Sequence, residues 1–348
     1  MEQKNDIKSM TLHELSALFS AKKFPAYRAK QVFSWLHRGT DSFEKMTNLP
    51  KSLRESLTKN NYISVANLEN KWISAYDSTV KYLFSLYDGV CVESVLMEYE
   101  HGHSLCVSTQ AGCRMGCTFC ATGLDGLLRN LTASEMLAQI EAAQRDQGIR
   151  ISNIVLMGMG EPLDNYDNVL RFLRLVSCEE GLHIGMRHIS LSTCGIVPKI
   201  RELMEERLQL TLSVSLHAPN DEIRSTIMPV NKAYNVDKLI AACRDYAAAT
   251  GRRISFEYAM IDGLNDSDVC ARELSQKLSG MLCHVNLIPV NAVEGNRFEK
   301  SKKERLERFS AILSRAGLNV TVRRTLGSDI EASCGQLRRR NRLDAECE

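Results

Sequence analysis

Short apolar runs alternate with segments of helical periodicity from about residue 105 onward. Runs of four to six residues are typical of buried strands, and apolar residues at every third or fourth position are typical of helices packed on one face. The predicted strands are Leu105–Thr109, Ile154–Met157, His188–Ser192, Thr211–Ser215, Ile254–Tyr258 and His284–Ile288. The predicted helices are Glu135–Arg145, Val169–Val176, Ile200–Glu206, Val236–Ala249 and Ala271–Lys277. This alternation predicts an α/β fold with a parallel sheet, namely a partial (β/α)6 barrel.

The first hundred residues carry two other patterns. Leu12, Leu15 and Phe19 recur at helical spacing after a potential cap at Thr11, and Tyr27–Leu36 has the pattern of a second helix. The segment that follows alternates like β-strands, at Val80–Leu86 and Val92–Met97. We therefore expect a small N-terminal helical domain at 1–60, an antiparallel β extension at 61–104, the barrel at 105–292 and a C-terminal segment at 293–348.

Composition places the chain among cytoplasmic globular proteins. It has 348 residues, of which 44% are hydrophobic and 25% charged, as is typical of soluble proteins. No apolar run approaches the roughly 20 residues of a membrane helix, and the N-terminus lacks a signal-peptide pattern. Twelve cysteines in a chain of this kind indicate a reducing compartment, with metal or redox roles for a few of them. We expect no membrane partner.

Positive charge is concentrated at the two ends of the chain. Residues 1–60 hold eleven Lys or Arg against six Asp or Glu, whereas the rest holds 33 against 36. Four arginines near the C-terminus are Arg338, Arg339, Arg340 and Arg342. Basic ends on a near-neutral body suit a polyanion such as nucleic acid, although charged runs are more often solvated surface.

Cys113, Cys117 and Cys120 form the most informative motif, in the run Ala111-Gly-Cys-Arg-Met-Gly-Cys-Thr-Phe-Cys-Ala-Thr-Gly123. Three thiolates at this spacing can hold three irons of a cubane cluster and leave the fourth iron open. Electron-transfer ferredoxins use four cysteines, so an open iron indicates that a small molecule binds the metal and reacts there. The motif resembles the radical S-adenosylmethionine superfamily, in which the open iron chelates the amino and carboxylate groups of the cofactor.

Two simpler interpretations of these cysteines remain. A zinc knuckle would need Cys106, His101 or His103 as its fourth ligand, and unligated thiols are often buried in a core. The zinc interpretation lacks the second Cys-x-x-Cys or His pair that zinc fingers carry. The cluster is therefore the favoured interpretation.

Polar residues follow several predicted strands, where barrels place their chemistry. In Met157-Gly-Met-Gly-Glu-Pro162 the glycines allow a ligand to approach the backbone, and Glu161 offers a carboxylate to an ammonium group. This run resembles the Gly-Gly-Glu-Pro element that holds the amino group of S-adenosylmethionine. The expected cofactor contacts are Gly160, Glu161, Ser192, Ser215, Leu216, His217 and Asn291.

The motifs together resemble one family, the bacterial radical methyltransferases that methylate C2 of adenine in large-subunit ribosomal RNA and in transfer RNA. The residues that carry this resemblance are Gly158-Met-Gly-Glu-Pro-Leu163, Ser190-Leu-Ser-Thr193, Ser213-Val-Ser-Leu-His-Ala-Pro-Asn220 and Asp329-Ile-Glu-Ala-Ser-Cys-Gly-Gln-Leu337. A related branch methylates C8 of adenine; Pro162 and Ala111 favour the C2 branch. The chain departs from the family at Cys194, where Ser is usual, and at Glu331-Ala-Ser333, where Asp-Ala-Ala is common.

The resemblance implies the cofactors and partners. It implies one [4Fe–4S] cluster held by the cysteine triad and two S-adenosylmethionine molecules consumed per turnover. It also implies 23S rRNA and tRNA as substrates, with the basic domain at 1–60 contacting RNA. A flavodoxin- or ferredoxin-type electron donor and a monomeric enzyme are expected.

The resemblance also implies three catalytic residues. Cys334 would accept a methyl group from the first S-adenosylmethionine. A radical derived from the second would then activate that methyl for addition to C2. Cys106 would resolve the resulting protein–RNA adduct by forming a disulfide with Cys334, and Glu93 would accept the C2 proton. From residue patterns alone, Cys106 would be a buried strand thiol and Glu93 an exposed strand position.

Two alternative functions remain open from the sequence. The first is C8 methylation by the antibiotic-resistance branch. The second is a zinc-containing RNA-binding protein without catalysis. The position of the methyl group in the product separates the first, and the identity of the metal separates the second.

Overall fold

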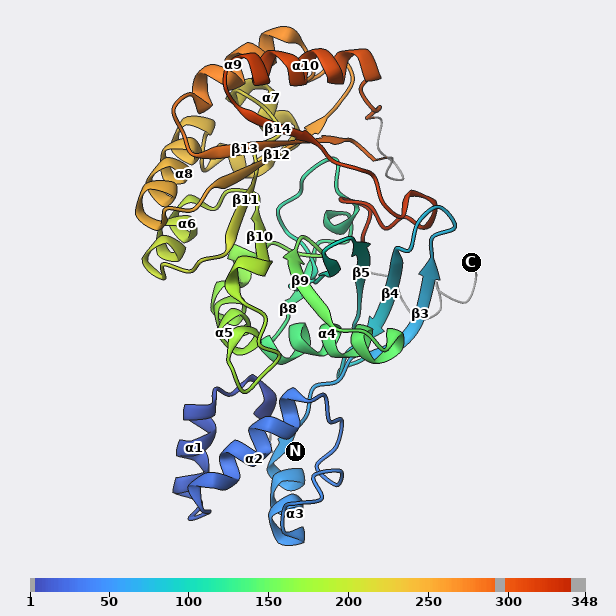
Figure 1. The fold of residues 1–348 in the computed structure, drawn as a ribbon, viewed down its shortest axis with the longest axis vertical. Helices are drawn as coiled ribbons and strands as arrows, with labels where there is room; N and C mark the ends of the chain where they lie inside the picture. Colours follow the sequence, from blue (N-terminus) through green and yellow to red (C-terminus); the bar gives the residue numbers. More distant parts are fainter. Residues whose placement is uncertain (1–3, 292–297, 339–348) are drawn as a thin grey trace.

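A curved sheet of ten strands organises the computed structural model, which describes residues 4–291 and 298–338. The strands in spatial order are β14 (Asn319–Val322), β13 (Cys283–Pro289), β12 (Ile254–Met260), β11 (Thr211–Ser215), β10 (Ile189–Thr193), β9 (Ile151–Leu156), β6 (Gly102–Cys106), β5 (Cys91–Tyr99), β4 (Val80–Ser85) and β3 (Asn67–Ile73). Neighbouring strands from β6 to β14 are parallel, and those from β3 to β6 are antiparallel. The barrel and the β extension are therefore one continuous sheet (Figure 1).

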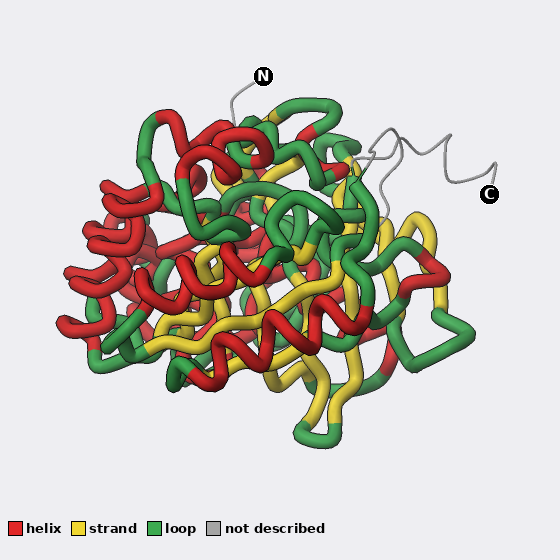
Figure 2. Tube along the Cα trace, turned by 90° about the horizontal axis from the view of Figure 1, so that it is seen from above, coloured by secondary structure: helices red, strands yellow, loops and turns green. Residues whose placement is uncertain are grey.

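Helices cover the outer surface of the parallel part of this sheet (Figure 2). They are α4 (Ala133–Gln147), α5 (Tyr166–Ser177), α6 (Val197–Glu205), α7 (Asp221–Ile227), α8 (Val236–Thr250), α9 (Asp268–Leu278) and α10 (Lys303–Arg315). Alternation along the strands explains this arrangement, because successive side chains point to opposite faces. In β11, Leu212 and Val214 are fully buried, whereas Ser213 and Ser215 line cavities inside the barrel.

The predicted fold is confirmed, with an additional strand and shifted boundaries. All six predicted barrel strands are present, but the first ends at Cys106 rather than at Thr109. Beyond it, the amides of Thr109 and Gln110 bond to the carbonyl of Met159 instead of to a neighbouring strand. A seventh parallel strand, β14, was not predicted, because its four residues lie at the sheet edge and are mostly exposed.

The N-terminal helices form a compact group at one end of the barrel (Figure 1). They are α1 (Leu12–Ala21), α2 (Ala26–His37) and α3 (Lys51–Asn60). The predicted cap at Thr11 is present: its hydroxyl accepts the Glu14 amide, and the Glu14 carboxylate accepts the Thr11 amide. Pro25 and Pro50 immediately precede α2 and α3.

A buried ion pair joins the N-terminal unit to the barrel. The Lys8 ammonium bonds to the Glu141 carboxylate of α4, and both side chains are almost completely buried. Beside it, the Ser134 hydroxyl donates to Asp6 at 2.6 Å, and the Ser134 amide donates to Ser9 Oγ at 3.0 Å. Burying two charges costs desolvation energy that only close pairing offsets, so this contact specifies how the unit is oriented on α4.

His37 lies next to this interface without a hydrogen bond to either ring nitrogen among the residues described. Its ring packs on Phe33 at a centroid distance of 4.1 Å. Burial, with a smaller contribution from the Lys8 charge, lowers the pKa of His37 to about 3. The imidazole is therefore neutral in the folded protein at physiological pH.

Removing Lys8 alone should destabilise the protein strongly. Lys8→Met leaves the Glu141 carboxylate buried without its partner, and we expect the free energy of unfolding to fall by about 3–5 kcal/mol. Lys30→Met is the control, because the Lys30–Glu180 pair at 3.7 Å is exposed and should contribute less than about 1 kcal/mol. Chemical denaturation measures both. A loss below about 1 kcal/mol for Lys8→Met, or failure of Lys8→Met/Glu141→Met to recover stability, would contradict this account.

His37 should contribute to loss of stability in mild acid. As pH falls below about 6.5, the unfolded chain protonates this residue, whereas the folded protein does so only near pH 3. The free energy of unfolding should therefore fall with pH across this window, by up to about 1.4 kcal/mol per pH unit from this one group. His37→Leu should remove that component, so that between pH 7 and 5.5 wild type loses about 1 kcal/mol more than the variant. If wild type and His37→Leu lose the same free energy of unfolding over this pH range, His37 does not contribute to the loss.

Candidate active site

The cysteine triad lies in a loop enclosed by a short hairpin. The hairpin strands are β7 (Gln110–Gly112) and β8 (Leu127–Asn130), and Cys113 N–H donates to the Gly126 carbonyl at 3.1 Å. Gly112 has a φ of +78°, and a Cβ there would lie 1.9 Å from the Gly126 oxygen, so only glycine fits. Cys113, Cys117 and Cys120 all line one cavity, here called the triad cavity.

The donor set of the triad cavity fits an iron–sulfur cluster. Burial raises the pKa of Cys113 to about 12, and it also raises the pKa of Cys117 and of Cys120. These thiols therefore ionise only beside strong positive charge, which iron supplies. Among the described residues, no three Cys, His, Asp or Glu side chains lie close enough together to hold one metal ion. This spacing is compatible with a cubane cluster, because each cysteine of a cubane binds a different iron.

None of the three fourth ligands that the zinc interpretation named, Cys106, His101 and His103, is among the described residues that line the triad cavity. Cys106 lines a different cavity, and the His101 ring stacks on Tyr99 at 5.3 Å. The cluster interpretation therefore gains support from the fold.

Glu161 is a buried carboxylate on the wall of the triad cavity. One oxygen accepts the Cys194 amide at 2.7 Å, and the other accepts the Leu163 amide at 3.0 Å. Burial raises the pKa of Glu161, and these amide bonds oppose the rise. A bound ammonium group would complete the compensation of its charge, as expected for the amino group of S-adenosylmethionine.

The glycines before Glu161 are required by close backbone contact. Gly160 has a φ of +101°, and a Cβ there would lie 2.8 Å from the Gln110 amide nitrogen. At Gly158 a Cβ would meet the Ser108 amide nitrogen at 2.8 Å. These contacts hold the loop after β9 directly against the start of the triad hairpin.

The other predicted cofactor residues mostly line the same cavity. Ser192, Ser215, His217 and Asn291 do so, as do Gly160 and Glu161. Leu216 is an exception: its side chain is fully buried in the hydrophobic core and does not line the cavity. The physical reason is the turn after β11, where the Leu216 and His217 amides both bond to the Glu257 carbonyl.

His217 is a neutral packing group in this wall. It has a φ of +57°, and its Nδ1 accepts the Ala259 amide at 2.9 Å. Its ring meets Phe119 of the triad loop edge-on at 4.9 Å. Burial lowers the pKa of His217 to about 3, so the ring serves to position Phe119 without carrying a charge.

Arg224 is an organising residue that sequence analysis missed. This fully buried side chain donates to the carbonyls of Cys194 at 2.6 Å, Leu216 at 3.0 Å and Ser215 at 3.1 Å, and to Asn231 Oδ1 at 3.0 Å. It thereby ties together the loops after β10 and β11. No sequence signal distinguishes this arginine from those on the surface, because its burial depends on how the loops after β10 and β11 fold around it.

Cys334 lies in a loop, residues 327–338, that docks on the triad loop. The Gly335 carbonyl accepts the Ala121 amide at 2.7 Å, and the Cys334 carbonyl accepts the Asn291 side-chain amide at 3.0 Å. We call residues 327–338 the carrier loop. Its bond to Ala121, next to Cys120, places Cys334 beside the triad loop.

The β extension holds both ends of the carrier loop. At one end, the Asp329 carboxylate accepts the Ser74 hydroxyl and the Ala75 amide, both at 2.7 Å. At the other end, the Glu93 carboxylate accepts the Arg338 amide at 2.9 Å. The antiparallel strands thus anchor the loop to the barrel.

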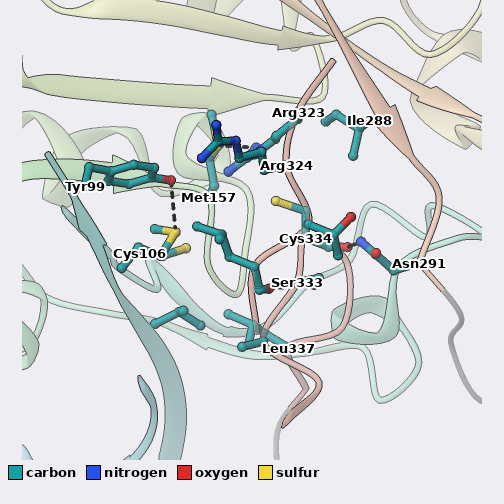
Figure 3. Close-up of a pocket in the computed structure, with 15 residues that line it drawn as sticks. Tyr99, Cys106, Met157, Ile288, Asn291, Arg323, Arg324, Ser333, Cys334 and Leu337 are labelled. Atoms are coloured by element: carbon teal, nitrogen blue, oxygen red, sulfur yellow. Dashed lines mark hydrogen bonds between the residues drawn. The ribbon is translucent and has the colours of Figure 1, made fainter. Parts of the chain in front are cut away.

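Cys106 and Cys334 line a second cavity, here called the Cys106 cavity, beside the triad cavity (Figure 3). Cys334 lines both cavities, so this residue lies at their junction. Burial raises the pKa of Cys106 to about 12, and the Cys334 sulfur adds to that rise. Both thiols are free in this structure.

Glu93 is fully buried, contrary to the exposed position that the strand pattern alone indicated. Its carboxylate lies 3.8 Å from the ammonium of Lys81, which is also buried. Glu93 shares a face of β5 with Val95, Met97 and Tyr99, which line the Cys106 cavity, but Glu93 itself is not among the described lining residues.

The C-terminal arginines are placed only in part. Arg338 is described, whereas Arg339, Arg340 and Arg342 lie outside the described residues.

None of the helices in the described ranges is long and apolar enough to traverse a bilayer.

Comparison with known proteins agrees with the geometry of the site. Residues 107–271 match the Radical SAM superfamily, and residues 5–63 match the ribosomal RNA large subunit methyltransferase N-terminal domain. A probable dual-specificity RNA methyltransferase RlmN of Clostridium tetani is 54% identical over 95% of each chain. Its counterpart in Alkaliphilus oremlandii is 52% identical over 97% of this chain and 99% of the relative.

A solved structure is also similar over the whole length. The crystal structure of a radical SAM methyltransferase from Sphaerobacter thermophilus is 46% identical, with a TM-score of 0.91. The alignment covers 96% of this chain and 99% of that one. The similarity therefore includes the N-terminal unit as well as the barrel.

The hydrogen bonds of the Asp329 carboxylate should restrict local opening of the carrier loop. Asp329→Ala removes the acceptor of the Ser74 and Ala75 bonds, and we expect hydrogen exchange at the Ala75 amide and in residues 327–338 to accelerate about tenfold. Exchange in β11 should not change. Ser328→Ala is the matched control, because this neighbouring side chain is exposed. Unaltered exchange in Asp329→Ala would show that the carrier loop is held by its other contacts.

Proposed function

The chain belongs to the RlmN family of radical S-adenosylmethionine RNA methyltransferases, and we propose that it methylates C2 of adenine in 23S rRNA and in tRNA, with Cys334 as methyl carrier. The observation that carries this proposal is the position of Cys334 at the junction of the triad cavity and the Cys106 cavity. A single sulfur there can receive a methyl group on one side and present it to a base on the other.

The residues of the triad cavity fit the cofactors that this chemistry needs. Cys113, Cys117 and Cys120 would hold a [4Fe–4S] cluster, and Glu161 would bind the ammonium of S-adenosylmethionine. When bound, the cluster supplies the electron that starts radical cleavage of S-adenosylmethionine. Ser192, Ser215 and Asn291 would provide polar contacts at the strand ends.

The two remaining cysteines have different environments that suit different tasks. Cys334 is partly exposed in the carrier loop, as a nucleophile that meets two ligands in turn must be. Cys106 is buried, and its raised pKa keeps it protonated at neutral pH. A protonated thiol is a weak nucleophile, so Cys106 stays unreactive during methylation. We propose that Cys106 later resolves the protein–RNA adduct on Cys334 by forming a disulfide with that residue.

We propose Glu93 as the acceptor of the C2 proton. It lies on the face of β5 that continues into the Cys106 cavity. Its contacts with Lys81 and with the Arg338 amide would hold the carboxylate in place at the base of the carrier loop.

The N-terminal unit offers a surface that suits RNA. A hollow on α2 is lined by two cationic side chains, Lys30 and Arg38, and two aromatic ones, Tyr27 and Trp35. Cations that bind phosphate and rings that stack on unpaired bases are the usual means of recognising RNA loops. Because the target base must leave its stack to react, contacts at a distance from the barrel would help to hold the rest of the RNA.

We also propose an electron donor, an oligomeric state and a cellular location for the enzyme. A flavodoxin- or ferredoxin-type donor would supply electrons, the enzyme would act as a monomer, and a cytoplasmic location would give it both reduced cysteines and ribosomal RNA.

An anaerobic assay tests the proposed reaction. Reconstituted protein is incubated with S-adenosylmethionine, a reductant and unmodified 23S rRNA or tRNA, and nucleosides are resolved by mass spectrometry. We expect 2-methyladenosine from wild type and none from Cys334→Ala, because the carrier sulfur is absent. Cys178→Ala is the control, since this thiol lies beyond α5 and lines neither cavity. Formation of 8-methyladenosine would overturn the C2 assignment, and no methylated adenine from protein with an intact cluster would overturn the proposed function.

A further inference from the structure

Asp164 is a mostly buried carboxylate in the loop after β9, three residues beyond Glu161. It lies in the short 3₁₀ helix Pro162–Asn165, and its amide donates to the Glu161 carbonyl at 3.0 Å. Its side chain is 9% exposed and accepts hydrogen bonds from Gln110 and Arg114. These two residues stand on either side of Cys113 in the sequence, so Asp164 holds the chain both before and after the first cysteine of the triad.

The Arg114 guanidinium binds the Asp164 carboxylate through two parallel hydrogen bonds. Arg114 Nε donates to Oδ2 at 2.9 Å, and Arg114 Nη2 donates to Oδ1 at 2.5 Å. Surface ion pairs usually contribute little to stability, but a bidentate pair has a defined geometry. Because the Arg114 side chain is 64% exposed, we expect this pair to fix the position of the triad loop more than it stabilises the fold.

Gln110 connects Asp164 with the backbone of Glu161. Its side-chain oxygen accepts the Glu161 amide at 2.8 Å, and its side-chain nitrogen donates to Asp164 Oδ2 at 3.0 Å and to Asn130 Oδ1 of β8 at 2.8 Å. The Gln110 side chain is fully buried, which restricts its movement. A continuous set of hydrogen bonds therefore runs from Arg114, next to Cys113, to Glu161.

The other parts of the triad loop are held by different segments. The Thr118 amide donates to the Ile227 carbonyl at the end of α7 at 3.0 Å, and the end of the loop bonds to the carrier loop as described above. These contacts lie near the second and third cysteines of the triad. Arg114 instead connects Cys113 with the loop that contains Glu161.

We propose that Arg114 and Asp164 are positioning residues that hold Cys113 and Glu161 at a fixed separation for the amino-acid end of S-adenosylmethionine. The proposal rests on the assignments of Cys113 to the cluster and of Glu161 to the ammonium group made under the proposed function. A ligand that must meet a metal cluster and a carboxylate together binds best where both are already in place, because less loop ordering is then needed on binding.

Arg114 and Asp164 act on the ligand indirectly. Neither is among the described residues that line the triad cavity, whereas Cys113 and Glu161 both line it. Their removal should therefore weaken binding of the ligand without removing any group that touches it. Arrangements of this kind around metal sites typically change affinity by about 10–100-fold when they are lost.

Binding of S-adenosylhomocysteine to the anaerobic, cluster-containing protein tests the proposal. This probe has the amino-acid end of S-adenosylmethionine but no transferable methyl group, so no turnover accompanies binding. Arg114→Met and Asp164→Asn should keep the wild-type iron content and raise the dissociation constant in equilibrium dialysis about tenfold. The double variant should bind no more weakly than either single variant, because both changes remove the same contact. Arg114→Lys, which keeps one ionic bond, should recover part of the affinity.

A spectroscopic measurement separates positioning from a general loss of stability. The electron paramagnetic resonance spectrum of the dithionite-reduced cluster should change when the probe binds to wild type. At a probe concentration that saturates wild type, the change should be incomplete in Arg114→Met. Arg308→Met is the matched control, because Arg308 of α10 is 69% exposed and pairs with Asp268 of α9 at 2.5 Å. This variant should match wild type in affinity and in spectrum.

Three results would overturn the proposal. They are wild-type dissociation constants in both Arg114→Met and Asp164→Asn, losses that add in the double variant, and an equal loss in Arg308→Met. If Arg114→Met does not retain its cluster, Arg114→Gln decides by the same dissociation constant and spectrum. These measurements need no RNA, so the absence of 2-methyladenosine from wild type would overturn the proposed function separately from the role of Arg114 and Asp164.

Discussion

The hydrogen bond from the Ala121 amide to the Gly335 carbonyl determines where Cys334 lies relative to the cysteine triad. A side chain that carries a group between two ligands works only within its own reach, so its backbone must be fixed at the boundary between them. The bonds of Asp329 to the β3–β4 turn and of Glu93 to the Arg338 amide fix the two ends of the same loop. The antiparallel extension of the sheet thus anchors the two ends of the carrier loop, whereas the triad loop and Asn291 of the barrel hold its middle.

The interior of the barrel contains several buried polar and charged side chains, whereas barrel cores are usually filled by branched apolar side chains. Buried polar groups are tolerated where each finds a partner. Arg224 is compensated by carbonyls, and Glu161 is bonded to two amides. Arg323 is the contrasting case, since its side chain donates, among the described residues, to the thioether sulfur of Met157. A guanidinium in the barrel that lacks oxygen acceptors indicates a position where a charged ligand or a reacting group binds.

A buried ion pair also orients the N-terminal unit on the barrel. Lys8 and Glu141 contribute little net stability as a pair, because desolvation offsets most of their attraction. Their value is geometric: they allow one orientation of the helices on α4 and penalise others. A fixed orientation matters if the cationic and aromatic hollow on α2 is to hold RNA while the base enters a distant cavity.

Local features of this protein were determined by its sequence, and the junction at Cys334 was decided by tertiary structure. The spacing of Cys113, Cys117 and Cys120, the cap at Thr11 and the alternation in β11 act over a few residues, so their patterns are visible in the chain itself. The sequence could not indicate that Leu216 faces the core, that Glu93 is buried beside Lys81, or that Arg224 joins the loops after β10 and β11. Those outcomes depend on which strands become neighbours and how their ends turn, and such contacts between distant segments leave no periodic signal along the chain.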